Sequence, residues 1–315
     1  MLEKELLEKI EKYDTIIIHR HSRPDLDALG SQLGLKIALK NKYPNKKIYA
    51  VGDTSRKYSF IGAMDLITDD IYNGALAIIC DVAVKNMVSD DRYTLAKEVF
   101  VIDHHKNDCD ITPNWLCDTS KIAAAEYIAD ILSRNNIEIP APAATAFMGG
   151  IITDSGRFLY GYSSNTFLTA AMLVRCGANV KYIYDNINVE TLEDRMMRNY
   201  FQNQIVYDDK IAYIKSGAEV FNKFNVDFQD ISRGMVSLMA GIAEIEIWCN
   251  FTYDKSVDKV IGEFRSRNIP IVDVAKKYGG GGHALACGAT LKDFNEADLV
   301  LNDFKELLKV SLYEG

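Results

Sequence analysis

The sequence predicts an α/β protein of two domains, on three observations. The 315 residues are many for one hydrophobic core, and short apolar strands alternate with helices in the first part of the chain. A second group of strand candidates begins near residue 204, after a long, charged helical pattern at residues 191–204 that suits a connection between domains. We expect a first domain at residues 1–188, a helical linker at 189–205 and a smaller second domain at 206–315.

In the first domain the apolar strand candidates are followed by helices or by acids. The expected strands are Thr15–His19, Lys47–Val51, Ala75–Cys80 and Glu98–Ile102, and Ala28–Lys40 is the first helix between them. Short apolar strands separated by helices indicate a parallel sheet with helices on both faces. Ligands bind such sheets beyond the carboxyl ends of the strands. Because acids or histidines follow three of these strands, we expect the chemistry at that edge.

The remaining elements follow from capping and periodicity. A helix is expected at Ile122–Arg134, with Thr119 or Ser120 as its N-cap, followed by helices at Ala143–Thr153 and Asn165–Arg175. Gly177 fits the position just after the last of these helices. The second domain should contain strands at Gln204–Tyr207, Lys210–Ile214, Ile242–Tyr253 and Lys259–Arg265, and helices at Ile271–Tyr278 and Asn295–Leu312.

Composition excludes several classes of protein. No apolar run approaches the roughly 20 residues that span a bilayer, so no membrane association is expected. The net charge of −8 argues against binding of long nucleic acids, which usually requires a basic surface, but not against a small phosphorylated ligand. The six cysteines are dispersed, which favours reduced thiols in the cytoplasm over disulfides or a zinc site.

Acids and histidines lie in a few short segments. His21, Asp25 and Asp27 follow the first strand, and Asp25 could equally be a helix N-cap and Asp27 a first-turn acid, although neither alternative explains His21. Asp81 ends the third strand, where an ordinary turn acid is the better interpretation when it is taken alone. Its functional interpretation is a carboxylate that bridges two metal ions.

The segment Asp103-His104-His105 follows the fourth strand directly. One imidazole can bind a metal and be oriented by Asp103, while the other can donate to a phosphate oxygen. Asp154 is unremarkable by itself at a helix end but completes a set of six ligands. His19 is more readily a packed histidine than part of the site. Such a set suits Mn²⁺ or Mg²⁺, and two ions about 4 Å apart can hold a phosphate and activate water.

A glycine run is the second segment that indicates a binding site. Tyr278 is followed by four glycines and His283, and the apolar sequence after it argues against a flexible linker. Without Cβ atoms, backbone N–H groups can approach an anion closely. Arg265-Ser266-Arg267, at a strand end shortly before, adds fixed cations for a phosphate or nucleotide.

Together these residues resemble the DHH phosphoesterase superfamily, and within it the stand-alone nanoRNase and pAp phosphatase (NrnA-like) group. The resemblance rests on His21…Asp25-x-Asp27, Asp81, Asp103-His104-His105 and Thr153–Phe158, and on Arg265–Arg267 and Gly280–His283, which resemble the associated DHHA1 domain. It covers essentially the whole chain. It implies a parallel-sheet DHH domain and a smaller α/β DHHA1 domain with a mixed sheet.

The resemblance also implies roles for individual residues. His21 and Asp25 would bind a first Mn²⁺, Asp27, His104 and Asp154 a second, and Asp81 would bridge them. His105 would contact the scissile phosphate, and Asp103 and His105 would be the catalytic residues. The substrate-binding residues would be Arg157, Arg265, Ser266, Arg267, Gly281, Gly282 and His283, with those of the second domain holding the far nucleotide.

The expected protein is therefore a cytoplasmic, Mn²⁺-dependent phosphoesterase. It would hydrolyse short RNA oligonucleotides or linear dinucleotides such as pApA to mononucleotides, and would also take 3′-phosphoadenosine 5′-phosphate (pAp). A cyclic-di-AMP phosphodiesterase is the nearest alternative, and an inorganic pyrophosphatase would not need the glycine run. A nucleotide-binding regulator without catalysis is the alternative from a different class. The sequence leaves open whether the chain forms a homodimer.

Overall fold

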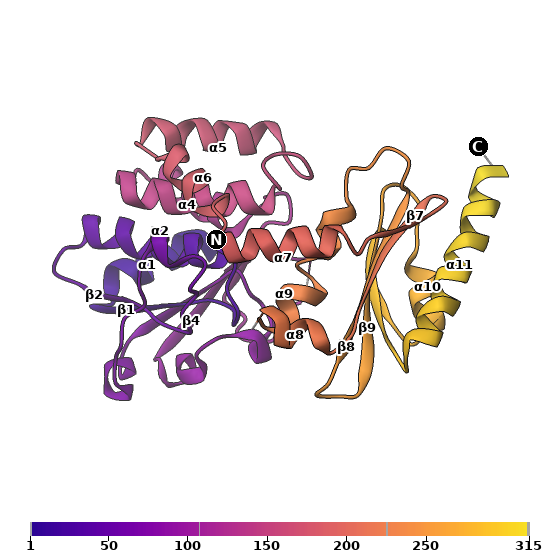
Figure 1. The fold of residues 1–315 in the computed structure, drawn as a ribbon. Coiled ribbons are helices and arrows are strands. Elements are labelled where there is room, and N and C mark those ends of the chain that lie inside the picture. Colours follow the sequence, from indigo (N-terminus) through magenta and orange to yellow (C-terminus); the bar gives the residue numbers. More distant parts are fainter. Residues whose placement is uncertain (1, 107, 225, 314–315) are drawn as a thin grey trace. The chain divides into compact units, whose positions relative to one another are not determined.

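The computed structural model describes residues 2–106, 108–224 and 226–313. The chain divides into two compact units, one ending at Val189 and one beginning at Glu190 (Figure 1). In the first unit the strands are β1 (Thr15–His19), β2 (Lys47–Ala50), β3 (Leu76–Cys80), β4 (Glu98–Asp103) and β5 (Trp115–Cys117). They form one parallel sheet in the order β2-β1-β3-β4-β5. The predicted parallel sheet is confirmed.

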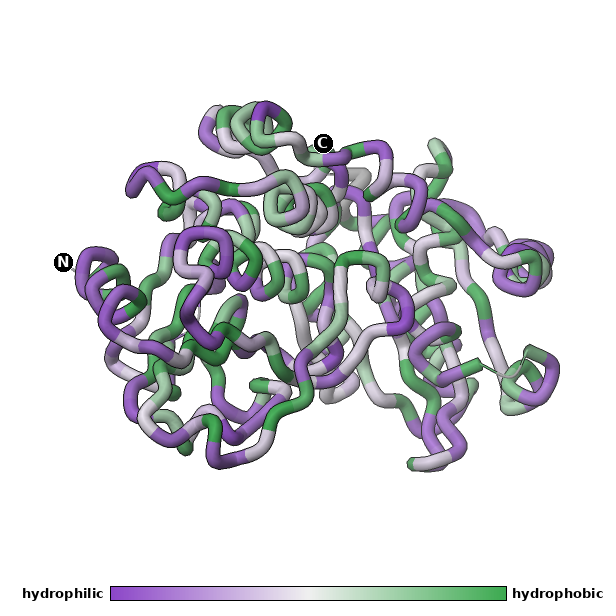
Figure 2. Tube along the Cα trace, turned by 90° about the vertical axis from the view of Figure 1, so that its left-hand side faces the viewer, coloured by the Kyte–Doolittle hydropathy of each residue, from purple (hydrophilic) through white to green (hydrophobic). Residues whose placement is uncertain are grey.

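The described part of this unit contains six α-helices. They are α1 (Leu2–Lys12), α2 (Leu26–Lys42), α3 (Ala124–Arg134), α4 (Ala141–Asp154), α5 (Ser164–Arg175) and α6 (Val180–Ile187). Helix α1 is largely hydrophilic, as Figure 2 shows beside the N label, and buries only Leu6 and Ile10. Among the described residues, no helix is both long and apolar enough to cross a membrane.

The two faces of the first sheet are covered differently. Ile16 and Ile18 point into the core that α1–α4 share, whereas Ile17 points to the other face, where Tyr72 packs. That second face is covered by loops and by the short 3₁₀ helices η2 (Asp69–Tyr72) and η4 (Asp91–Leu95), not by α-helices as the sequence suggested. The periodicity of a 3₁₀ turn of four or five residues is too short to be recognised in the sequence.

Helices α2 and α4 pack backbone to backbone. A Cβ atom on Gly30 would collide with the carbonyl oxygen of Ala146, and one on Gly150 would lie 2.5 Å from the Asp27 carboxylate. Both positions therefore require glycine. The close approach brings the start of α2, with Asp25 and Asp27, next to the end of α4, with Asp154.

The predicted cap of α3 is wrong. Neither Thr119 nor Ser120 caps this helix, which begins at Ala124 without a side-chain cap of its own segment. Instead, the buried Asp27 carboxylate accepts hydrogen bonds from the backbone N–H of Ala124 (2.7 Å) and Ala125 (2.9 Å). A cap from a residue 97 positions away leaves no local signal in the sequence.

The second unit is built on a mixed sheet, as predicted, but its described part has six strands where the sequence suggested four. Its strands are β6 (Val206–Asp208), β7 (Ile211–Ser216), β8 (Ile247–Asp254), β9 (Lys259–Ser266), β10 (Gly281–His283) and β11 (Ala286–Leu291), in the order β10-β11-β9-β8-β7-β6. Among the strand pairs of the described residues, β7 and β8 are parallel and the others antiparallel. One core lies between the sheet and the helices α10 (Val272–Lys277) and α11 (Phe294–Tyr313). Another involves α7 (Leu192–Gln202), α8 (Glu219–Phe224) and α9 (Phe228–Ser232).

The helix expected as a linker is α7. Its Met197 and Phe201 are buried in a core with Ala212 and Ile214 of β7, so the helix packs as part of the second unit. A Thr191–Asp194 capping box begins it. The charged pattern that suggested a linker is its exposed face.

His19, the last residue of β1, is a packed histidine. Its ring is fully buried between Tyr72 and Tyr93, and Nε2 lies 3.4 Å from the Tyr72 hydroxyl. Burial disfavours the charged imidazole and lowers the pKa of His19 to about 4.

This burial predicts an acid-labile contribution to stability. In the unfolded chain His19 is protonated below about pH 6.5, whereas in the folded protein it stays neutral down to about pH 4. The free energy of unfolding therefore falls as the pH drops from 6.5 towards 4. We expect wild type to lose about 2 kcal/mol more than His19→Gln between pH 7 and pH 5. Urea denaturation with chelator present measures this difference, and equal losses in both proteins would contradict it.

Candidate metal centre

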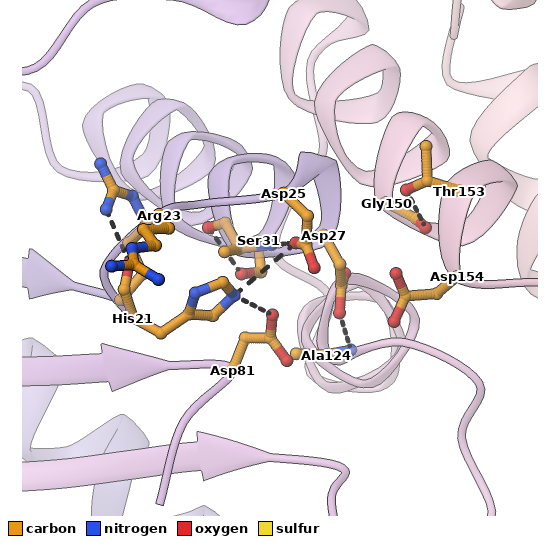
Figure 3. A network of polar contacts seen from close by, with 12 residues as sticks. His21, Arg23, Asp25, Asp27, Ser31, Asp81, Ala124, Gly150, Thr153 and Asp154 are labelled. Carbon is orange, nitrogen blue, oxygen red and sulfur yellow. Dashed lines mark hydrogen bonds and ion pairs between the residues drawn. The ribbon is translucent and has the colours of Figure 1, made fainter. Parts of the chain in front are cut away.

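Loops after three adjacent strands converge at one edge of the first sheet, as expected. His21 follows β1, Asp81 follows β3, and the segment from Asp103 to His105 ends β4. The start of α2, with Asp25 and Asp27, and the end of α4, with Asp154, complete the site. Figure 3 shows the side chains of His21, Asp25, Asp27, Asp81 and Asp154 directed towards a common space.

Two groups of donors share this space. In the first, His21 Nε2 lies 3.7 Å from Asp25 Oδ1 and 3.4 Å from Asp81 Oδ2. In the second, His104 Nε2 lies 3.8 Å from Asp27 Oδ2 and 3.6 Å from Asp154 Oδ2.

The Asp81 carboxylate joins the two groups. Its Oδ2 faces His21, and its Oδ1 lies 3.4 Å from His104 Nε2. Asp81 itself has a backbone φ of 60°, which non-glycine residues rarely adopt, and it is almost fully buried. Such strain is common where a side chain must be aimed at a functional site.

The electrostatics fit divalent cations. Burial, followed by repulsion from neighbouring aspartates, raises the pKa of Asp27 well above its usual value and that of Asp154 to about 7. Burial opposes the charging of His21, yet the carboxylates of Asp25 and Asp81 raise its pKa to about 10. Without a metal, protons therefore partly balance the charge of the cluster.

Two atoms aimed into the cluster have unmet bonding capacity. Among the described residues, Asp81 Oδ1 and His104 Nε2 are buried and have no hydrogen-bond partner. In the part of the chain that the structure describes, three groups of three donors within 4.8 Å of one another could hold metal ions: the two groups above, completed by Asp81 and by Asp154, and a third of Asp81, His104 and His105. The donor set therefore fits hard divalent ions.

Asp103 orients the imidazole of His105, whereas the imidazole of His104 faces the carboxylates of Asp27, Asp81 and Asp154. Asp103 Oδ1 lies 2.8 Å from His105 Nδ1 and also accepts the backbone N–H of His104. The ring of His104 instead places Nδ1 3.3 Å from the carbonyl of Lys121. The hydrogen bond to Asp103 raises the pKa of His105 to about 9.

Asp25 combines the two interpretations that the sequence left open. Its Oδ1 accepts the backbone N–H of Ala28 at 2.9 Å and so caps α2, while the same carboxylate faces His21. The cap fixes the direction of this side chain, because the helix start defines where the carboxylate must lie.

A buried network supporting the His21 loop was not predicted. Arg20 is fully buried, donates to the carbonyl of His21 at 2.8 Å and pairs with Asp53 at 2.7 Å. Asp53 also accepts the N–H of Arg23 at 3.0 Å and the hydroxyl of Ser89. Arg20, a charged residue directly after an apolar strand, was the available signal, because buried arginines are rare unless paired.

The expected substrate-binding residues of the second unit lie at one end of its sheet. Arg265 on β9 and His283 on β10 both pair across strands with Ala286 of β11, so the two side chains share a row on one face. Ser266 alternates to the other face, where its Oγ accepts the N–H of Ile269, and Arg267 donates to the carbonyl of Ile242.

The glycine run forms an edge strand and not a closed loop. Gly281, Gly282 and His283 are exposed on β10, the last strand of the sheet. Gly282 has a φ of 133°, which favours glycine. An edge strand presents unpaired backbone groups, which is the property that the sequence suggested for anion binding.

Comparison with known proteins identifies the class. Residues 15–151 match the DHH family, N-terminal domain, and residues 214–310 match the DHHA1 domain. The chain belongs to the DHH family, and the resemblance drawn from its motifs is confirmed.

Characterised relatives align over nearly the whole chain. The bifunctional oligoribonuclease and PAP phosphatase NrnA of Bacillus subtilis is 32% identical, over 98% of this chain and 99% of that protein. The protein of the same name from Mycoplasma pneumoniae is 32% identical, over 97% and 96%. An exopolyphosphatase-related protein from Bacteroides fragilis shares the fold, with a TM-score of 0.84 at 22% identity, over 98% of this chain and 97% of that one.

The position of Asp81 between the two donor groups predicts unequal effects of neighbouring substitutions. Asp81→Asn should weaken binding at both groups, whereas Asp25→Asn should weaken only the first, because Asp25 does not face His104. We expect fewer than one tightly bound Mn²⁺ per chain in the first variant and about one in the second. Calorimetry and elemental analysis count the ions. Two tightly bound ions in Asp81→Asn would contradict a shared carboxylate.

Proposed function

We propose that the chain is a divalent-metal-dependent phosphoesterase that hydrolyses short oligoribonucleotides, or linear dinucleotides such as pApA, to mononucleotides. The observation that carries this proposal is the pair of donor groups joined by Asp81. The relatives named as oligoribonucleases and PAP phosphatases support the substrate class. Because the same relatives are also named PAP phosphatases, we propose pAp as a second substrate.

We assign two divalent ions, most suitably Mn²⁺, to the centre. His21 and Asp25 would hold one, Asp27, His104 and Asp154 would hold the other, and Asp81 would be shared between them. Bound divalent ions polarise phosphoryl oxygens and lower the pKa of a bound water. The protein contributes the rigid placement of the ligands, because the α2 cap, the α3 cap and the strained turn at Asp81 each fix one carboxylate.

His105 acts on the substrate and not as a ligand in this proposal. Asp103 engages its Nδ1 and favours the protonated ring, so Nε2–H can donate to a non-bridging oxygen of the scissile phosphate. His105 is also the more exposed imidazole of the pair, at 47% of its side chain against 12% for His104.

The second unit supplies substrate contacts. We propose that residues 1–188 form the catalytic domain and 206–315 the substrate-binding domain, with 189–205 connecting them. Arg265 and His283, in one row of the sheet, would hold a phosphate of the substrate, with Ser266, Arg267, Gly281 and Gly282 beside them. In the first unit, Arg157 would add a cation.

The chemistry of the surface favours short substrates. A chain with net charge −8 gains little from the backbone of a long polyanion, so long nucleic acids are poor partners. We further propose a cytoplasmic location, since all described cysteines are free thiols. A homodimer is also proposed, supported by the exposed apolar side chains Phe167, Leu168 and Val174 of α5.

A substrate panel tests the function. Purified protein with Mn²⁺ is offered pApA, pAp, cyclic-di-AMP, pyrophosphate and RNA of 2 to about 24 nucleotides, and kcat/KM is compared. We expect pApA and RNA of about 2–5 nucleotides to lead, and rates to fall steeply with length. Asp81→Asn, prepared in the same way, should lose at least about 100-fold on every substrate, which excludes a contaminating nuclease.

Each rival has its own signature in this panel. A higher kcat/KM for cyclic-di-AMP than for pApA would favour the cyclic-dinucleotide phosphodiesterase, and activity on pyrophosphate alone would favour a pyrophosphatase. Absence of turnover with both ions bound would indicate a regulator. Equal rates on the 24-mer and the 3-mer would contradict the short-substrate proposal.

A further inference from the structure

A second pocket lies beside the metal centre at the carboxyl end of α4. Its volume is about 270 Å³, and it is lined by residues of the loop after β2, the end of α4 and the turn that follows. Asp154 lines the cavity of the metal centre, while Thr153 and Gly156 line this pocket. Neighbouring Cα atoms are 3.8 Å apart, so the end of α4 is a thin wall between the two spaces.

The lining has the chemistry of a nucleotide subsite. Lys57 and Arg157 bring two cations, and none of the described residues that line the pocket is acidic, in a chain whose 44 acids outnumber its 36 basic residues. Tyr58 and Tyr160 bring two aromatic rings, and the Lys57 ammonium lies 5.1 Å from the Tyr58 ring centre. Aromatic rings with adjacent cations are the usual platform for an unpaired base.

The turn that carries Arg157 and Tyr160 is built rigidly. Buried Ser155 organises it, because its Oγ accepts the N–H of Phe158 at 2.9 Å and its carbonyl accepts the N–H of Tyr160 at 3.0 Å. Three successive residues, 156–158, have φ values of 57°, 63° and 62°, and two of them are not glycine. Backbone held in this sparsely populated region usually serves a site.

The exposure of this turn is not explained by packing. Leu159 is 69% exposed and Tyr160 84% exposed, yet the backbone beneath them is fixed by the hydrogen bonds to Ser155. The segment that follows Tyr58 is held as well, since the carbonyl of Phe60 accepts a hydrogen bond from the Tyr182 hydroxyl at 3.0 Å. Two hydrogen-bonded segments, one carrying the exposed Tyr160 and the other the half-buried Tyr58, suit a ligand that enters between them.

We propose that this pocket binds the base of the nucleotide whose phosphate lies at the metal centre. Tyr58 and Tyr160 contact the faces of the base, and Lys57 and Arg157 neutralise phosphate charge. A volume of about 270 Å³ is at the lower limit of ligand pockets and suits one nucleoside, so a single base is recognised here. This inference rests on the proposed phosphoesterase function and adds a base-recognition subsite to it.

Binding of two small probes tests the subsite without turnover. AMP and ribose 5-phosphate share the phosphate and the sugar and differ by the base. Calorimetry with Mn²⁺-loaded protein should give roughly 5- to 150-fold tighter binding of AMP, the range expected for stacking of one base. Tyr160→Ala and Tyr58→Ala should each reduce this ratio at least about threefold and leave ribose 5-phosphate binding unchanged.

Tyr162→Ala is the matched control. Tyr162 is an exposed aromatic residue of the same turn, at 64%, and does not line the pocket, so the ratio should keep its wild-type value. Tyr160 belongs to none of the hydrophobic cores. Thermal melting checks that Tyr160→Ala and Tyr58→Ala are folded. An unchanged ratio in Tyr160→Ala and Tyr58→Ala would overturn the subsite, as would equal binding of AMP and ribose 5-phosphate by wild type.

Parallel hydrolysis of pApA separates this inference from the function on which it rests. If the protein hydrolyses pApA, but neither tyrosine substitution changes the ratio of AMP to ribose 5-phosphate affinity, the subsite alone is overturned. A ratio that depends on the tyrosines without any turnover would overturn the proposed hydrolysis and leave a nucleotide-binding pocket.

Discussion

Electrostatic repulsion among four clustered aspartates, of which Asp27 and Asp81 are buried, is the constraint on which the first unit depends. Asp25, Asp27, Asp81 and Asp154 converge on one space, and their proximity, together with burial, raises the pKa of Asp27 and Asp154. Such a cluster opposes folding unless protons, imidazoles or metal ions neutralise it. Each carboxylate must therefore be held by interactions stronger than the repulsion. The fold supplies these interactions through helix starts, strand ends and close helix packing.

Asp27 shows how structure and chemistry share one side chain. It stabilises the first turn of α3 through two backbone N–H groups, and those bonds fix its carboxylate beside His104. Gly150 leaves the room that the carboxylate occupies, because a Cβ there would lie 2.5 Å from Asp27 Oδ1. The same close packing of α2 against α4 brings in Asp154. The contacts that position the proposed ligands are thus also contacts that stabilise the domain. Their favourable energy offsets the repulsion between the carboxylates.

Local patterns predicted most of this arrangement, and long-range contacts account for what they missed. The strands β1, β3 and β4 were predictable because buried parallel strands are short apolar runs, and that placed His21, Asp81 and Asp103 at one edge. The cap of α3 and the Arg20–Asp53 pair depend on residues that meet only in the folded chain, and no spacing in the sequence encodes them. Asp103 and His105 are neighbours in sequence, but which of the two imidazoles Asp103 contacts depends on the direction of the rings. The pocket at Tyr58 and Tyr160 was missed for the same reason. Its walls come from segments about 100 residues apart, and of its lining only Thr153, Gly156 and Arg157 belonged to a recognisable motif.

The central claim is that one carboxylate, Asp81, is shared by two metal ions. The most direct measurement is anomalous diffraction at the manganese edge from crystals grown with Mn²⁺. The account predicts two anomalous peaks per chain about 3.5–4 Å apart, one beside His21 and Asp25 and one beside His104 and Asp154, with an oxygen of Asp81 within bonding distance of each. A single peak, or two peaks of which only one contacts Asp81, would contradict it.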